Sequence, residues 1–148
     1  MRVVLQRVRR ASVTVNGERV AEIGRGYLLL VGVGRGDQPD EADRLAEKIV
    51  NLRLFADRDG KTNLAIGDVG GEVLVVSQFT LFADLRKGRR PSWGDAEDTE
   101  VAAERVESLA AAIEARGPTV RRGVFGATMD VELLNEGPFT LVLDAASL

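Results

Sequence analysis

The segment Ser77-Gln78-Phe79-Thr80 places two hydroxyl groups, an amide and an aromatic ring in four consecutive positions. It follows an apolar run, residues 73–76, that is typical of a buried strand. Buried hydroxyl and amide groups cost about 1–3 kcal/mol each when they lack partners, so a core is a poor place for them. Open α/β sheets often bind ligands where a strand ends. We therefore predict a functional site at residues 77–80.

The absence of histidine and cysteine from the 148 residues restricts the chemistry of this segment. Without an imidazole there is no Ser-His-Asp triad, and without a thiol there is no thiolate nucleophile or zinc–thiolate site. A neutral hydroxyl is a weak nucleophile without a base, and no lysine or carboxylate lies close in sequence to Ser77 or Thr80. We expect these hydroxyls to orient a substrate or support the structure rather than to form a covalent intermediate.

Four cations and one aromatic residue lie close together a few residues further on: Arg86, Lys87, Arg89, Arg90 and Trp93. Cations with an interleaved aromatic ring suit the phosphates and unstacked bases of RNA. The alternative is an exposed solubilising loop with Trp93 packed against the core. The position of the cations just after residues 77–80 favours RNA binding.

Three further motifs have ordinary explanations as turns. The glycine-rich residues 32–37 lack the spacing of a dinucleotide-binding loop and are not followed by a phosphate-binding lysine. Residues 57–60, Asp-Arg-Asp-Gly, hint at a calcium loop, but Lys61 falls where an oxygen ligand is needed. We predict a solvated hairpin or loop there and no metal site. Taken alone, residues 135–138, Asn-Glu-Gly-Pro, are typical of a turn between two strands.

The composition is ordinary for a globular protein, with 45% apolar and 29% charged residues. A formal net charge of −3 argues against non-specific coating of nucleic acid, although it is compatible with a local basic patch. No apolar run reaches the roughly 18–20 residues of a membrane helix, and a charge interrupts the apolar residues 1–7, as in a strand rather than a signal peptide. We expect a cytoplasmic protein with no membrane or DNA partner and no cofactor.

Apolar patterns predict strands at residues 2–8, 12–15, 19–23, 27–33, 72–77, 129–134 and 139–143. Asn16-Gly17 lies between two of these strands and is a strong signal for a type I′ hairpin turn.

Helical periodicity predicts two helices, residues 39–52 and 99–115, the first capped by Asp37 or Asp40. The expected apolar faces are Ala42, Leu45, Ala46, Ile49 and Val50 in the first helix, and Val101, Val106, Leu109 and Ile113 in the second. The expected fold is α/β (α+β): a single domain over residues 1–148, with a mostly antiparallel, barrel-like sheet and two main covering helices.

Two motifs together resemble those of the D-aminoacyl-tRNA deacylase (D-tyrosyl-tRNA deacylase) family: Ser77-Gln78-Phe79-Thr80-Leu81 and Asn135-x-Gly137-Pro138-x-Thr140. The likeness covers the whole chain and includes the opening Met1-Arg2-Val3-Val4-Leu5-Gln6-Arg7-Val8, Asn16-Gly17, Lys87-Gly88-x-Arg90-Pro91-Ser92 and Gly123-x-Phe125-Gly126-Ala127-x-Met129. Phe139 is a departure, because the family more often has valine there. We expect this change to alter packing near Gly137-Pro138 but not the activity.

The resemblance implies hydrolysis of the ester between a D-amino acid and the 3′-terminal adenosine of tRNA, with the ribose 2′-OH assisting. Mischarged glycyl-tRNA is an expected second substrate, because glycine has no side chain to reject. The residues that the resemblance places in the site are Ser77, Gln78, Phe79 and Thr80 as the catalytic group, Phe125 and Met129 lining the pocket, and Arg86, Lys87, Arg89 and Arg90 contacting tRNA. Backbone N–H groups near Ser77 and Phe79 would hold the ester or adenosine end.

The family is a homodimer with active sites at the interface, in which a cis Gly-Pro peptide reaches into the partner's pocket. Carried over to this chain, Gly137 and Pro138 would bind the substrate and exclude an L side chain by collision with a rigid backbone.

Two alternatives from other functional classes stay open at this point. One is a non-catalytic RNA-binding module that uses residues 86–93. The other is a metal-dependent hydrolase that uses Asp57, Asp59 and Asp84.

Overall fold

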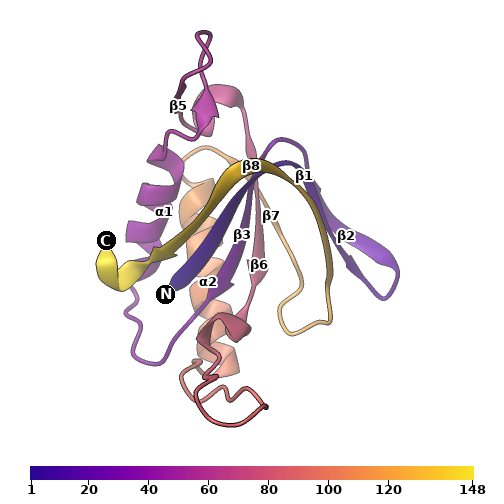
Figure 1. The fold of residues 1–148 in the computed structure, drawn as a ribbon, viewed down its shortest axis with the longest axis vertical. Coiled ribbons are helices and arrows are strands. Elements are labelled where there is room, and N and C mark those ends of the chain that lie inside the picture. Colours follow the sequence, from indigo (N-terminus) through magenta and orange to yellow (C-terminus); the bar gives the residue numbers. More distant parts are fainter.

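The computed structural model describes residues 1–148, which form a curled sheet with two helices on one face (Figure 1). The helices are α1 (Glu41–Asn51) and α2 (Thr99–Glu114), which pack side by side. The strands are β1 (Arg2–Val15), β2 (Glu18–Ile23), β3 (Gly26–Gly32), β4 (Phe55–Ala56), β5 (Thr62–Leu64), β6 (Glu72–Ser77), β7 (Thr119–Arg122) and β8 (Asp130–Asp144). Three short 3₁₀ turns complete the chain: η1 (Gly67–Val69), η2 (Phe79–Phe82) and η3 (Ala145–Ser147).

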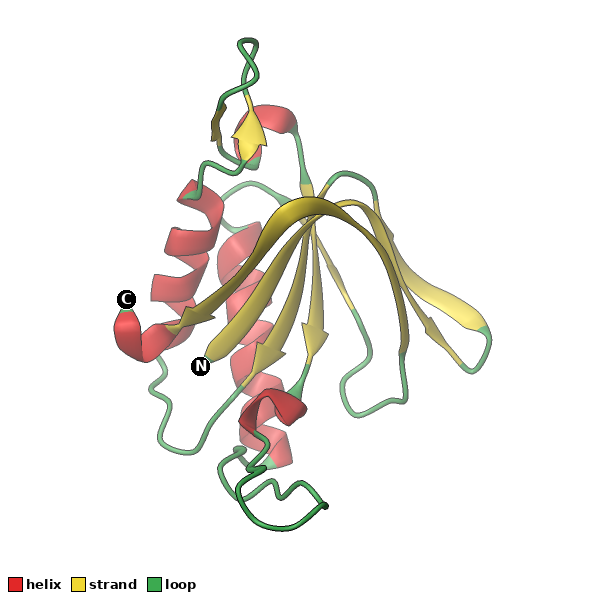
Figure 2. Ribbon diagram, viewed as in Figure 1, coloured by secondary structure: helices red, strands yellow, loops and turns green.

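Strand β1 organises the sheet because it pairs antiparallel with β2, β3 and β8. Strand β3 continues the sheet through parallel pairs to β6 and then β7. Figure 2 shows β1 and β8 arching together over the remaining strands, which gives the sheet its nearly closed, barrel-like curl. The expected fold class is therefore confirmed.

The structure corrects two predicted strand breaks. Residues 2–8 and 12–15 belong to one strand, β1, whose pairing with β8 shifts register between Gln6 and Arg10. Residues 135–138 are likewise no chain-reversing turn. They form an irregularity inside β8, because both halves of β8 pair with the same partner strand. A bulge of this kind interrupts the ladder locally and bends the strand without ending it.

Asn16 and Gly17 both have positive φ, 50° and 78°, at the tip of the β1–β2 hairpin. The predicted type I′ turn requires this conformation at both central positions, so the hairpin prediction is confirmed. The continuous apolar run at residues 27–33 is also explained, because β3 is buried on both faces. Leu29 contributes to the core under the helices, and Leu28 contributes to a second core inside the curl.

Helix α1 buries the face predicted for it, but neither expected cap is present, since Asp40 stands at the N-cap position without a side-chain hydrogen bond. The carboxylate of Asp37 is engaged elsewhere: it accepts from the Gly34 N–H at 2.6 Å and pairs with the ammonium of Met1 at 2.7 Å. In α2, Leu109 and Ile113 are buried as predicted, and Val106 packs against the core. Val101 was assigned to this face wrongly, because 39% of its surface is exposed.

The glycine-rich residues 32–37 form a turn, as predicted, in which the Asp37 N–H donates to the Gly34 carbonyl at 3.1 Å. Gly34 also has a packing role. A Cβ atom at this position would lie 2.4 Å from Cε1 of Phe82 in η2. The missing side chain therefore lets the 3₁₀ turn that follows β6 press directly against the end of β3.

We predict that Gly34→Ala lowers the free energy of unfolding by about 1–3 kcal/mol, because the added methyl group overpacks the contact with Phe82. Urea denaturation of both proteins measures the difference. Gly94→Ala is the matched control, since no atom lies within 4 Å of its new Cβ. Equal stability of Gly34→Ala and wild type would contradict this packing role.

Candidate active site

The Ser77–Thr80 segment is located where β6 leaves the sheet. Ser77 is the last residue of β6 and pairs with Val31 of β3. The Gln78 N–H donates to the Val31 carbonyl at 2.7 Å, and the chain then enters η2 at Phe79. Since this Gln78 donor is already used, any backbone donors for a substrate would come from the residues beside it.

Arg2 holds the far end of η2 in place. Its Nη1 donates to the Leu81 carbonyl at 3.1 Å, and its guanidinium lies 5.1 Å from the centre of the Phe82 ring. The same guanidinium pairs with Asp144 at the end of β8, with 3.0 Å between Nη2 and Oδ2. Burial alone would raise the pKa of Asp144, but the hydrogen bonds from Arg2 and the Ala146 N–H outweigh it and lower the pKa. Arg2 therefore joins η2 to β8.

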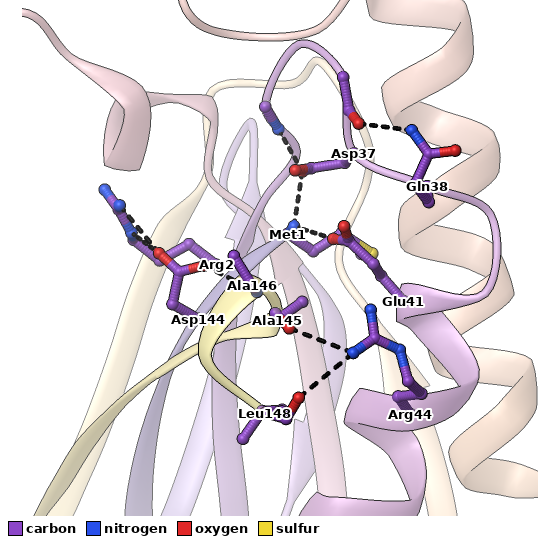
Figure 3. A network of polar contacts seen from close by, with 12 residues as sticks. Met1, Arg2, Asp37, Gln38, Glu41, Arg44, Asp144, Ala145, Ala146 and Leu148 are labelled. Atoms are coloured by element: carbon purple, nitrogen blue, oxygen red, sulfur yellow. Dashed lines mark hydrogen bonds and ion pairs between the residues drawn. The ribbon is translucent and has the colours of Figure 1, made fainter.

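A second polar network lies beside these contacts of Arg2 and fixes the start of β1 (Figure 3). The Met1 ammonium lies between Asp37, at 2.7 Å, and Glu41. Arg44 of α1 donates to the carbonyls of Ala145 and Leu148 at 3.3 and 3.5 Å. These contacts attach the turn after β3 and the C-terminal residues to the same end of the sheet.

A cavity of about 400 Å³ opens next to η2, within the usual size range of small-molecule sites. Ser77, Gln78 and Phe79 line one side of it, and Phe125 and Trp93 contribute aromatic surface. The remaining wall contains apolar residues and three charged ones: Val31, Val33, Arg35, Ala96, Glu97, Asp98, Thr99, Ala102, Val106 and Gly126. The structure thus brings together the first three residues of the predicted segment, Phe125, and Trp93 of the basic loop (residues 86–93).

Thr80 and Met129 do not line this cavity. Thr80 is exposed, and its hydroxyl oxygen accepts a hydrogen bond from Nε2 of Gln78. An amide donor occupies a lone pair of the hydroxyl but cannot remove its proton, so this contact does not activate a nucleophile. Met129 is half-buried and packs against the second core inside the curl. The pocket-lining role expected for it stays a prediction.

Gly137 and Pro138 lie far from the cavity of their own chain. Both are exposed and joined by a cis peptide bond, in the irregular part of β8 beside Arg7. Ser77 is level with Val3 of β1 through Val31. The two motifs are thus separated by about 13 Å along the strands, at 3.3 Å per residue, and by three strand spacings across the sheet. One chain alone does not combine them.

Arg7 is the residue beside Gly137-Pro138 that sequence reasoning missed. It is only 8% exposed, its Nη1 donates to the Leu54 carbonyl, and its Nε lies 3.6 Å from Oε2 of Glu136. The guanidinium also lies 4.3 Å from the centre of the Phe139 ring. It therefore contacts the residues on both sides of the Gly-Pro pair. A buried arginine that pairs with two distant segments gives no local sequence signal beyond a charge inside an apolar strand.

The basic loop is partly neutralised. Arg86 forms two 2.8 Å hydrogen bonds to the carboxylate of Asp84, and this interaction lowers the pKa of Asp84 to about 2. Asp84 also exchanges backbone hydrogen bonds with Ser92, which closes the loop. The other cations, Lys87, Arg89 and Arg90, are exposed and form no ion pair within the chain. Three of the four predicted cations are therefore free to meet an anion.

The carboxylates proposed for a metal site are not clustered. Asp57 accepts from the N–H groups of Asp59 and Lys61 within the β4–β5 hairpin, which confirms the predicted solvated hairpin. Asp84 belongs to the loop at the opposite end of the molecule (Figure 1). No group of three acidic residues lies close enough together to hold a metal ion. The geometry therefore argues against the metal-dependent alternative.

Neither helix of this structure has the length and apolar character that crossing a membrane would require.

A family model described as D-Tyr-tRNA(Tyr) deacylase matches residues 4–144 of the chain. A D-aminoacyl-tRNA deacylase of Chloroflexus aurantiacus is 57% identical over 148 residues, which cover 100% of this chain and 92% of that protein. Another protein of the same name, from Roseiflexus castenholzii, is 56% identical over 146 residues and covers 99% of this chain and 93% of its own length.

Two solved structures share the fold. The c-Myc DNA unwinding element binding protein superposes with a TM-score of 0.90 at 40% identity, covering 97% of this chain and 98% of that one. A probable eukaryotic D-amino acid tRNA deacylase superposes with a TM-score of 0.78 over 96% of this chain and 97% of its own. Its identity is 18%, so this second likeness concerns the fold alone.

Proposed function

The chain belongs to the D-Tyr-tRNA(Tyr) deacylase family, and we propose that it hydrolyses the ester bond of D-aminoacyl-tRNA, releasing the free D-amino acid and tRNA. The observation that carries the proposal is the match of nearly the whole chain to this family's model. The position of Ser77, Gln78 and Phe79 at the border of the 400 Å³ cavity agrees with it. The basic loop beside this cavity favours an RNA substrate over a small ester.

The chemistry that we propose depends on positioning rather than on a titrating side chain. An aminoacyl ester is already activated, and the neighbouring ribose 2′-OH can assist in its hydrolysis. Each tenfold in rate requires only about 1.4 kcal/mol of barrier reduction, and oriented N–H donors can supply several kcal/mol. Backbone donors near Ser77 and Phe79 would stabilise the oxyanion, and Gln78 with Thr80 would shape the pocket. The Gln78–Thr80 hydrogen bond supports an orienting role for this pair.

Selection against L substrates is assigned to Gly137 and Pro138 of a second subunit. In one chain these residues are exposed and distant from Ser77, so they are available to another subunit's pocket. Arg7 holds the residues on either side of them in place through its contacts with Glu136 and Phe139. A firmly held backbone at this point would collide with an L side chain and leave a D side chain or glycine unhindered, so glycyl-tRNA is included among the proposed substrates.

An exposed apolar row supports a homodimer with its active sites at the interface. Val142, Val4 and Leu30 are cross-strand neighbours on the face of the sheet that points away from the helices. Val142 is 68% exposed, and the other two are half-buried. Leu30 pairs with Val76, the residue before Ser77. A subunit covering this row would therefore come near the strand end where Ser77 lies.

The proposal predicts hydrolysis of D-aminoacyl-tRNA, retention of L-aminoacyl-tRNA and no loss of activity in a chelator. Ser77→Ala and Thr80→Ala should keep substantial activity, because no group in the structure activates either hydroxyl. Release of labelled amino acid from D- and L-aminoacyl-tRNA measures each of these outcomes. Binding of tRNA without ester cleavage would instead support the non-catalytic RNA-binding alternative. Complete loss in folded, RNA-binding Thr80→Ala would identify a nucleophile.

Gly137→Ala should reduce activity at least tenfold or admit L substrates while leaving stability near that of wild type. No atom lies within 4 Å of the added Cβ, so the chain itself tolerates the methyl group. In the pocket of the partner subunit, the same methyl group would collide with the substrate or the pocket wall. Parallel deacylation assays and urea denaturation separate the two effects, with Gly67→Ala as an equally uncrowded control remote from the site. Wild-type rates and chirality in Gly137→Ala would exclude the screening role.

Val142→Asp should convert a two-chain particle into a single chain of 16.0 kDa and abolish deacylation, because burial of an unpaired carboxylate in the interface is costly. Light scattering coupled to size-exclusion chromatography gives the mass. Val20→Asp on the β1–β2 hairpin, where the valine is 42% exposed, is the control. A monomeric wild type with full activity would contradict the shared site.

A further inference from the structure

Trp93 is an exposed aromatic residue at the rim of the cavity. It is 40% exposed, and its ring meets the ring of Phe79 edge-on, with 5.0 Å between centroids and 71° between planes. Phe79 is itself 55% exposed. The edge-on contact uses Phe79 to fix the orientation of the indole while leaving aromatic surface of both rings uncovered.

Charges of opposite sign lie in the cavity and on the loop that carries Trp93. Glu97 and Asp98 line the cavity, and Arg35 pairs with Asp98 at 3.1 Å. Outside the cavity, on the loop that carries Trp93, stand the unpaired cations Lys87, Arg89 and Arg90. A phosphate is attracted to the loop and repelled by the carboxylates, whereas the amino group of a nucleobase can donate to a carboxylate. This arrangement favours a nucleotide whose base faces the cavity and whose phosphate faces the loop.

We propose that Trp93 is a stacking site for the base of the nucleotide that precedes the terminal adenosine of tRNA. The inference rests on the proposed function, because that function puts the terminal adenosine and its ester against Ser77 and Phe79. Trp93, whose ring contacts Phe79, and the start of α2 then line the part of the cavity where the preceding nucleotide leaves it. Single-stranded RNA is commonly held in this way, by aromatic stacking next to a cationic track.

The alternative is a purely structural role, in which Trp93 only packs the loop against η2. Packing accounts for the contact with Phe79, but it does not explain why the indole stays 40% exposed on a loop that also carries three unpaired cations. The two explanations differ in one measurable respect. A packing residue affects every substrate equally, whereas a stacking residue affects only those substrates that contain the second nucleotide.

Intrinsic fluorescence tests the stacking directly in the wild-type protein, because Trp93 is the only tryptophan in the chain. The probe is a short single-stranded RNA that ends in cytidine, cytidine and adenosine, and the control RNA has an abasic residue next to the adenosine. We expect the first RNA to quench the emission and the abasic RNA to quench it much less. Equal quenching by both, or no quenching at RNA concentrations that saturate deacylation, overturns the proposal.

Kinetics provides the second test. For D-aminoacyl-tRNA, Trp93→Ala should raise KM by about 5- to 100-fold with little change in kcat, the effect of losing one base stack. For a D-aminoacyl ester of adenosine alone, which lacks the second nucleotide, KM should not change. Trp93→Phe should restore most of the affinity. Leu85→Ala is the control on the same loop, since Leu85 is 69% exposed and does not line the cavity.

The possible failures are distinguishable. An equal rise in KM on both substrates means that Trp93 serves the terminal adenosine or the packing of the loop, and it overturns the stacking role. If wild-type protein hydrolyses neither substrate, the proposed function has failed, and the fluorescence comparison still decides whether Trp93 stacks on the penultimate base.

Discussion

The pairing of β1 with β8 along nearly their whole length is the constraint on which this structure depends. It runs from Arg2 opposite Asp144 to Thr14 opposite Asp130, and it fixes the position of each residue of β8 relative to the sheet. Through β3 and β6 the same register places Ser77 level with Val3, four residues along β1 from Arg7, which lies beside the Gly-Pro pair. The separation of the two motifs is thus a property of strand register, and it is the physical reason why a site that uses both must draw on two subunits.

The cavity is lined by no histidine or cysteine, and its charged residues already have partners within the chain. Arg35 pairs with Asp98, and Glu97 accepts a hydrogen bond from the Asp98 N–H. Such a pocket contributes shape and fixed dipoles rather than acid or base catalysis, which suits a substrate that brings its own reactive ester and hydroxyl. The free cations lie outside on the loop, where they can attract an RNA backbone without entering the reaction.

Much of the fold could be predicted where one local signal decides the outcome. Asn16-Gly17 specifies a turn by itself, and the apolar run before Ser77 specifies a strand. Strand β7 was missed because Val120 is its only buried residue, which leaves no periodicity to detect. The continuity of β1 and β8 was missed because a bulge and a turn have similar local sequences and differ only in which strand pairs next.

In the candidate site, too, residues with a local sequence signal could be predicted, and residues that act through distant partners could not. Ser77, Gln78, Phe79 and Phe125 could be predicted and do meet at the cavity, because β6 ends beside the loop that follows β7. The supporting arginines could not be predicted. Arg2 acts through Leu81 and Asp144, and Arg7 acts through Leu54 and Glu136, all distant in sequence. Long-range partners of this kind are set by topology, which no local pattern contains.

Strand β8 carries both the Gly-Pro pair and Asp144, which holds η2 through Arg2. In the proposed two-subunit site, one strand would thus support the pocket of its own chain and present a motif to the pocket of another. Inserting or deleting a single residue between these two points would shift one of them relative to β1 and turn its side chains to the opposite face. The β4–β5 hairpin can therefore tolerate insertions and deletions, whereas the proposed two-subunit site requires a constant residue count from Gly137 to Asp144.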